Sequence, residues 1–155
     1  MNETEELFQA IQTNNNNKLK STLAAQPGLV NSKDARGFTP LIFASYFDNQ
    51  KATEIILDSG ADIDAKDASG NTALIGVSFK GNRIMAKLFI DHGANLNAAN
   101  INGTTPLIFA ATYGQKEIVN LLLKTGADKS VKDNDGMTAY DRAKEKGHKQ
   151  ILEIL

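Results

Sequence analysis

The sequence contains no cysteine and no tryptophan among its 155 residues. Without cysteine, the chain forms no disulfide bond, offers no thiolate ligand to zinc and has no cysteine nucleophile. This absence does not fix the cellular compartment, because cysteine-free proteins occur on both sides of membranes. Hydrophobic residues make up 41% of the chain and charged residues 23%, values that are ordinary for a folded globular domain.

Neither sign of charge is in excess, and there is no long hydrophobic run. Seventeen Lys and Arg residues against eighteen Asp and Glu residues leave a formal net charge of −1. A strongly basic nucleic-acid-binding protein or a polybasic membrane anchor would carry a clear cationic excess. No apolar stretch approaches the roughly 18 residues of a membrane-spanning helix. The composition therefore predicts no nucleic-acid partner and no insertion into a membrane.

The first twenty residues, Met1 to Lys20, are acidic and then rich in asparagine. They lack the positively charged segment and the following apolar stretch of a secretory signal. We therefore expect a cytoplasmic protein, or a periplasmic or secreted one if a signal peptide has been removed. The four consecutive asparagines 14–17 are expected to form a turn, a structure for which asparagine is well suited.

A repeat of 33 residues organises most of the chain. Two series recur at this interval, Gly37, Gly70, Gly103 and Gly136 and Thr39, Thr72, Thr105 and Thr138. A further series of glycines, each followed by alanine, consists of Gly60, Gly93 and Gly126. No insertion or deletion interrupts the register from Asp34 to Leu155, so the spacing indicates an internal repeat and not a coincidence.

Two segments of this repeat resemble those of a known family. Residues 37–62 begin Gly-Phe-Thr-Pro-Leu, residues 102–128 begin Asn-Gly-Thr-Thr-Pro-Leu, and both end in Gly-Ala-Asp, a pattern that closely resembles the ankyrin repeat. The resemblance implies an all-α fold, an ankyrin-repeat solenoid of stacked helix-turn-helix pairs with β-turn or hairpin-like loops. It implies one domain over 1–155, with an N-terminal capping repeat (1–33), full repeats (34–66, 67–99 and 100–132) and a C-terminal capping repeat (133–155).

Local signals agree with this architecture. The four threonines are good N-caps for the first helix of each pair, and proline follows two of them at the first helical position. The residues expected to end these helices in a left-handed conformation are Asp48, Gly81, Gly114 and Gly147. The second helices are expected to end in the same way at the glycine that precedes each alanine.

The loops differ from the ankyrin signature at one position. That signature has histidine after Thr-Pro-Leu, and the histidine links neighbouring loops by hydrogen bonds. This sequence instead has isoleucine, at Ile42, Ile75 and Ile108. We therefore expect apolar contacts to hold neighbouring loops together. The aspartates that begin the loops are expected to accept backbone hydrogen bonds.

No catalytic, cofactor-binding or metal-binding site is predicted. His92 and His148 lie in different repeats, and neither has a second histidine or a group of carboxylates at metal-ligand spacing. Gly76 and Gly81 have the spacing of a phosphate-binding loop, but the Lys-Ser or Lys-Thr that must follow is missing. We therefore expect a protein that is not an enzyme and uses no cofactor.

Gly76 stands at a helical position where the neighbouring repeats have Phe43 and Phe109. Glycine costs about 1 kcal/mol of helix propensity relative to alanine. One interpretation is steric, since the two flanking phenylalanines would need the space. The other is functional, since the missing side chain would leave a groove for a partner's side chain. Dense packing of protein cores favours the steric interpretation.

In ankyrin-like proteins, partners contact the loop tips and the concave face of the inner helices. Carried over by register, the predicted partner-binding residues are Arg36, Phe38, Tyr46, Phe47, Ser69, Asn71, Phe79, Lys80, Asn102, Thr104, Thr112, Tyr113, Asp135 and Met137. Five of the ten aromatic residues of the chain are among them. Clustered exposed rings mark binding sites, although any single ring could instead pack between neighbouring inner helices.

The resemblance implies a non-enzymatic protein–protein interaction module, and we expect the chain to be monomeric when unbound. It could inhibit its partner, as some small bacterial ankyrin-like immunity or self-protection proteins do. It could instead be an adaptor that stabilises or localises its partner, and an enzyme is a more remote alternative.

Overall fold

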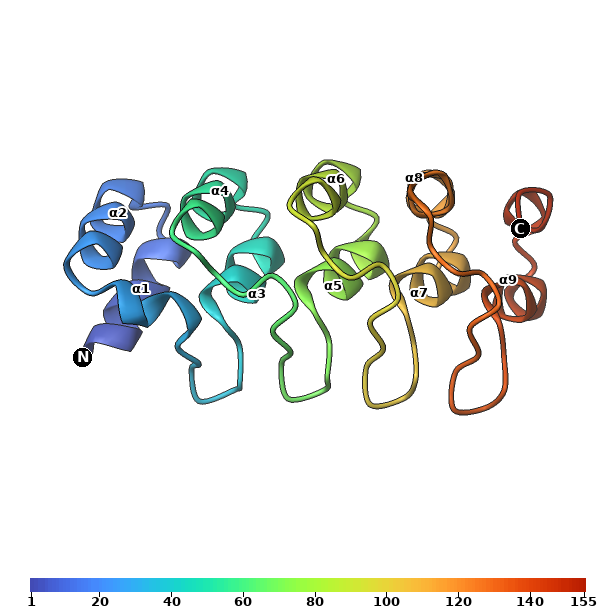
Figure 1. The fold of residues 1–155 in the computed structure, drawn as a ribbon, viewed down its shortest axis with the longest axis horizontal. Helices are drawn as coiled ribbons and strands as arrows, with labels where there is room; N and C mark the ends of the chain where they lie inside the picture. The colour runs from blue at the N-terminus through green and yellow to red at the C-terminus, as the bar shows by residue number, and fades with distance from the viewer.

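The chain forms two rows of helices along one axis of the molecule, as the computed structural model of residues 1–155 shows (Figure 1). The inner row consists of α1 (Glu3–Gln12), α3 (Pro40–Tyr46), α5 (Ala73–Lys80), α7 (Pro106–Thr112) and α9 (Ala139–Lys146). The outer row consists of α2 (Asn16–Ala25), α4 (Gln50–Asp58), α6 (Arg83–Asp91), α8 (Lys116–Thr125) and α10 (Lys149–Leu152). There is no strand, and the predicted all-α solenoid of stacked helix pairs is confirmed.

The inner helices begin where the sequence predicts. The four repeating threonines are N-caps, and each side-chain oxygen accepts a hydrogen bond from the backbone N–H three residues later. In the last repeat Asp141 also accepts from the backbone N–H of Thr138, which completes a capping box. The helices are short because a left-handed residue follows each of them, and at Asp48 this residue is not glycine (φ 53°).

The hydrophobic core lies between the two rows and between successive pairs. Phe89 and Ile56, on outer helices, and Leu74, on an inner helix, are each at most 1% exposed. Every one of these side chains belongs to one continuous cluster that runs from Leu7 in α1 to Ile151 in α10. No pair has a core of its own, because each buries its apolar face only against its neighbours.

Four long loops extend from the inner row on the side away from the outer helices (Figure 1). In each loop the backbone N–H of the first residue donates to the carbonyl four residues later, as from Asp67 to Asn71 at 2.9 Å. The side-chain oxygen of that first residue accepts two further backbone hydrogen bonds, which for Asp67 come from Ser69 and Asn71 at 2.9 Å each. The predicted hairpin-like loops and the predicted role of the aspartates are confirmed.

Neighbouring loops are joined by hydrogen bonds, so the expectation of apolar contacts alone is wrong. The N–H of Ile101 donates to the carbonyl of Ser69 at 3.1 Å, and the N–H of Asn134 donates to the carbonyl of Asn102 at 3.0 Å. Backbone groups, together with the side-chain amides of Asn100 and Asn134, thus replace the histidine of the ankyrin signature. The isoleucine at that position, such as Ile75, is buried in the stack.

The N-terminal repeat differs from the prediction in one detail. Only the first two of the four asparagines form the turn, with Asn14 in a left-handed conformation (φ 57°) and Asn15 as the N-cap of α2. The other two already belong to α2, because the Asn15 side chain accepts from the N–H of Lys18 and so starts the helix there. A 3-10 helix, η1 (Pro27–Asn31), then leads to the first loop.

Two glycine substitutions with the same backbone conformation measure how tightly the loops stack. Gly70 and Gly136 have φ values of +77° and +76°. An added Cβ would lie 2.9 Å from the backbone nitrogen of Ile101 at Gly70 but would meet no atom within 4 Å at Gly136. The left-handed conformation costs about 1–2 kcal/mol in both alanine variants. The clash should cost Gly70→Ala about 1–3 kcal/mol more.

Urea unfolding of both variants measures this difference. Equal losses of unfolding free energy in Gly70→Ala and Gly136→Ala would show that the loops move apart freely and contribute little to the stack.

Candidate partner-binding face

The exposed side of the inner helices and the adjoining loops form one surface, the inner face, which corresponds to the predicted concave face. At its N-terminal end, four rings form the first aromatic cluster, Phe8, Phe43, Tyr46 and Phe47. Edge-to-face contacts join them, with ring centroids 5.0 Å apart for Phe8–Phe43, 4.8 Å for Phe43–Phe47 and 5.3 Å for Tyr46–Phe47. Within the cluster, the Phe43 ring is buried, whereas Tyr46 is 61% exposed.

Three rings further along the inner face form the second aromatic cluster, Phe79, Phe109 and Tyr113. The centroid of the Phe79 ring lies 4.6 Å from that of Tyr113 and 5.8 Å from that of Phe109, and both contacts are again edge to face. Phe79 is 44% exposed and Tyr113 51%. Each exposed ring is therefore held by a neighbour and still presents an open surface, so the rings are neither core residues nor free side chains.

A pocket separates the two clusters at Gly76. It has a volume of about 240 Å³, and Phe38, Ile42, Tyr46 and Phe79 form much of its wall. No atom lies within 4 Å of the place where a Cβ on Gly76 would stand. The steric interpretation of Gly76 is therefore wrong, because neither Phe43 nor Phe109 lies within 4 Å of the added Cβ and neither lines the pocket there.

Filling this position with a methyl group should stabilise the fold. Gly76 lies inside α5 with ordinary helical geometry, and the added Cβ of Gly76→Ala would meet no neighbouring atom. We expect the unfolding free energy to rise by about 1 kcal/mol, the difference in helix propensity. Thermal or urea unfolding checks this, and a loss of stability would mean that α5 packs more tightly in solution.

At the N-terminal edge of the inner face, Arg36 binds the first residue of its own loop. Its Nε and Nη2 donate to Asp34 Oδ2 at 3.0 and 2.6 Å. The guanidinium carbon also lies 4.9 Å from the centre of the Phe38 ring and 5.1 Å from that of Phe43. Burial alone would raise the pKa of Asp34, but hydrogen bonds from Arg36 and from two backbone N–H groups lower it.

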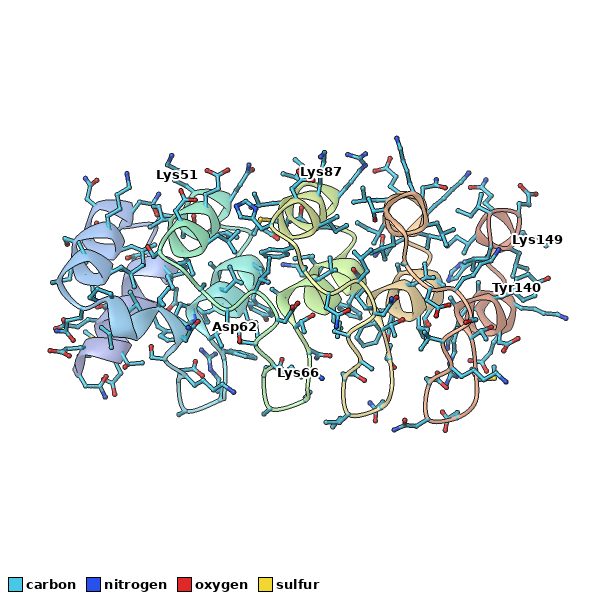
Figure 2. The ribbon with its side chains drawn as sticks, viewed as in Figure 1. Lys51, Asp62, Lys66, Lys87, Tyr140 and Lys149 are labelled. Atoms are coloured by element: carbon cyan, nitrogen blue, oxygen red, sulfur yellow. The ribbon has the colours of Figure 1, made fainter.

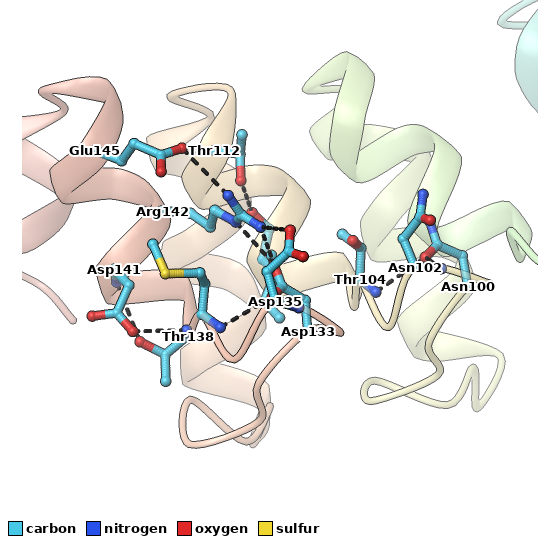
Figure 3. A network of polar contacts seen from close by, with 12 residues as sticks. Asn100, Asn102, Thr104, Thr112, Asp133, Asp135, Thr138, Asp141, Arg142 and Glu145 are labelled. Carbon is cyan, nitrogen blue, oxygen red and sulfur yellow. Dashed lines mark hydrogen bonds and ion pairs between the residues drawn. The ribbon is translucent and has the colours of Figure 1, made fainter.

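At the C-terminal edge, Arg142 on α9 holds a group of carboxylates together (Figure 3). Its Nε donates to Asp133 Oδ2 at 2.9 Å, its Nη2 lies 3.0 Å from Asp135 Oδ2, and its Nη1 lies 3.3 Å from Glu145. The hydrogen bond to Asp133 is the largest effect that raises the pKa of Arg142. For Asp133, burial alone would raise the pKa, but the hydrogen bonds from Met137, Arg142 and Asp135 lower it.

The variant Asp133→Asn tests this ion pair through its pH dependence. Asparagine still provides the oxygen that accepts from the loop, as Asn100 does in the preceding repeat, but removes the charge facing Arg142. We expect a loss of about 1–2 kcal/mol of unfolding free energy at pH 7. Because the folded-state pKa is lowered, the carboxylate contributes fully above its unfolded pKa of about 3.9. The contribution disappears as the pH falls through the folded-state value.

Urea unfolding of both proteins from pH 7 to about pH 2 follows the difference in stability. That difference should narrow below about pH 4. A difference that stays constant throughout would contradict a role for the charge.

The remaining predicted residues are distributed along the same face. Ser69, Asn102 and Asp135 are exposed at the loop tips, and Asn71, Thr112 and Met137 are half-buried. Thr104 is buried, at 9% exposure, and its N–H donates to Asn100.

Lys80 reaches back to the preceding repeat, where its Nζ donates to the carbonyl of Tyr46 at 2.7 Å and pairs with Asp48 at 3.1 Å. Whether these residues bind a partner stays a prediction.

Part of the inner face was missed in the sequence. A wide depression of about 610 Å³ at the N-terminal end is lined by residues of α1, including Phe8, Gln9 and Gln12, together with Arg36. The N-terminal repeat departs from the 33-residue register, so positions could not be carried over to it. The contact of Phe8 with Phe43 places α1 in the same surface.

Both histidines have structural partners. His148 Nε2 lies 3.0 Å from the carbonyl of Thr112 in the preceding repeat, and His92 Nδ1 lies 2.8 Å from the carbonyl of Leu88. No group of three or more His, Asp or Glu side chains is placed to hold a metal ion.

No helix has the length and apolar character needed to span a membrane. On the opposite side, charged residues such as Lys51 and Lys87 extend from the outer row (Figure 2).

Comparison with protein families gives one result. The model for ankyrin repeats (3 copies) matches residues 7–100 and again residues 77–155, so that the two matches together reach from residue 7 to the C-terminal residue. A search of curated proteins finds no match.

Proposed function

The chain belongs to the ankyrin-repeat family, and we propose that its inner face binds another protein. Ankyrin repeats are generally protein–protein interaction modules. The observation that carries the proposal for this chain is the row of exposed rings on one side, with Tyr46 61%, Phe47 42%, Phe79 44% and Tyr113 51% exposed. Tyrosine and phenylalanine are enriched at the cores of protein interfaces, where their burial supplies much of the binding energy.

The rings are also ordered before binding. Each makes an edge-to-face contact with a neighbouring ring on the same rigid stack of helices. A partner that covers them therefore gains hydrophobic burial while little side-chain freedom is lost. The outer helices offer no comparable group of rings, and their single large exposed hydrophobic residue is Ile84, at 62% exposure.

A monomer that covers one partner can act in two ways. If the covered surface includes the partner's own functional site, the chain is an inhibitor, and an immunity role belongs to this class. If it leaves that site open, the chain is an adaptor. We propose that the chain is an inhibitor, because one compact inner face suits a single partner. We also propose that it is located in the cytoplasm.

A capture experiment with matched variants tests binding by the inner face. The bait proteins are the wild type, the double variant Tyr46→Ala/Tyr113→Ala and the single variant Ile84→Ala, which removes an exposed hydrophobic residue from the outer row. We expect one protein from cytosolic or envelope fractions of the source organism to be captured by the wild type and by Ile84→Ala. Its capture by the double variant should fall at least tenfold, about 1.4 kcal/mol.

Circular dichroism confirms that all three baits are folded. Equal capture by all three, or a loss only with Ile84→Ala, would contradict binding by the inner face. The purified partner then distinguishes the two roles, because an inhibitor lowers the partner's activity in proportion to complex formation and an adaptor does not. The fraction in which the partner is found tests the location.

A further inference from the structure

The first residue of each loop uses one side-chain oxygen, Oδ1, in the same way in all four loops. These residues are Asp34, Asp67, Asn100 and Asp133, spaced 33 residues apart. In all four, Oδ1 accepts hydrogen bonds from the backbone N–H groups two and four residues later. This task needs only an oxygen, and the asparagine performs it as well as the aspartates do.

The second oxygen is where the repeats differ. Asp34 Oδ2 receives the guanidinium of Arg36, and Asp133 Oδ2 receives that of Arg142 at 2.8–2.9 Å. The third repeat has no arginine here and has the neutral Asn100 in place of the carboxylate. Asp67 is the exception, because it keeps the carboxylate and no group of the chain donates to its Oδ2.

The space that an arginine would fill is also open at this repeat. Gly76 occupies the same register position as Arg142, the residue that reaches back to Asp133 in the last repeat. Ser69 likewise stands where the first repeat has Arg36. Both positions from which the chain itself supplies an arginine are therefore occupied by small residues, and the pocket of about 240 Å³ that results is lined by Asp67.

No other arginine of the chain can supply the missing group. The chain has three, and the third, Arg83, begins the outer helix α6, away from the inner face. We propose that the pocket at Gly76 binds an arginine side chain of a partner protein, whose guanidinium pairs with Asp67 Oδ2. This inference rests on the proposed function, because the pocket lies in the same inner face.

The walls of the pocket suit an arginine. Phe79 offers aromatic surface to the aliphatic stem and to the flat face of the guanidinium, as Phe38 and Phe43 do for Arg36. The Tyr46 ring already has Lys80 Nζ 5.4 Å from its centre, so its edge offers apolar wall to the stem. A cavity of about 150 Å³ holds a benzene ring, so the volume here is ample for one side chain. A purely apolar occupant would fit the walls but would cover Asp67 Oδ2 without providing a hydrogen bond, which is costly.

The one cation in the wall does not oppose this pairing. Lys80 stands at the C-terminal end of α5, whereas Asp67 precedes its N-terminal end, and a helix of this length separates them by about 10 Å. The Lys80 ammonium group is also engaged by Asp48 and by the carbonyl of Tyr46.

Small capped amino acids test the pocket without knowledge of the partner. N-acetyl-arginine methylamide is titrated into the isotope-labelled chain and followed by NMR, beside the citrulline, lysine and phenylalanine analogues. We expect saturable shifts of the amides of Asp67, Asn71 and Gly76, with a dissociation constant on the order of millimolar. Citrulline, which has nearly the same shape without the charge, should bind at least fivefold more weakly.

Two variants and a control make the assignment specific. Asp67→Asn keeps the loop, as Asn100 shows, and should reduce arginine binding at least fivefold. Asp58→Asn, a neutralisation on the exposed end of α4, should leave it unchanged. Gly76→Arg should fill the pocket from within, as Arg142 does in the last repeat. It should abolish binding of the probe and raise the unfolding temperature by a few degrees, a rise that is lost when Asp67→Asn is added.

Three results would overturn the inference. They are the absence of saturable binding of the arginine probe to the wild type, equal binding to Asp67→Asn, and stronger binding of the phenylalanine probe, which would make the occupant apolar. These outcomes leave the proposed function untouched if the capture experiment still depends on Tyr46 and Tyr113. Conversely, equal capture by the wild type and by the Tyr46→Ala/Tyr113→Ala variant would contradict the proposed function, even if the arginine probe binds beside Asp67.

Discussion

The fold depends on the fact that no helix pair of this chain can bury its apolar face alone. The core is one cluster that passes through all five pairs, and its members are drawn from both helices of each pair. The stack must therefore keep a constant step between repeats, since a change at one junction would propagate along the whole cluster. Polar contacts maintain the same step. Asn49 donates to the carbonyl of Ile11, Gln115 to that of Phe79, and His148 contacts that of Thr112.

This constraint separates the residues that build the stack from those that are free to vary. Core positions of the inner helices repeat nearly unchanged, as at Leu41, Leu74 and Leu107, whereas the side of these helices that forms the inner face changes from one repeat to the next. The register position that holds Phe43, Gly76, Phe109 and Arg142 in turn is the clearest case. It contributes a ring to the first aromatic cluster, a pocket, a ring to the second cluster and then an ion pair. One backbone geometry thus presents four different surfaces, and their order along the chain defines the inner face.

The sequence predicted the architecture well because the repeat states the same local signals four times. Threonine caps, left-handed glycines and the apolar periodicity all point to the same helix pairs, and the loops follow from the aspartates that begin them. The predictions that failed, on the contacts between loops and on the space beside Gly76, concern features that the local sequence does not encode. Two of the hydrogen bonds between loops join backbone groups, which no side-chain pattern reveals. The space beside Gly76 depends on how the neighbouring rings turn, and that is decided by packing in three dimensions.

The same reasoning explains why the inner face needs a polar group among its rings. Aromatic surface alone binds many partners, because most proteins can offer an apolar side chain to it. A carboxylate whose second oxygen is unpaired changes this, because a partner that covers Asp67 without providing a donor must remove its water and gains nothing in return. A partner with an arginine in the right place gains a charge-assisted hydrogen bond instead. If the inner face binds a partner as proposed, the rings would supply affinity to any suitable surface, whereas Asp67, a carboxylate kept where the next repeat has an amide, would select among them.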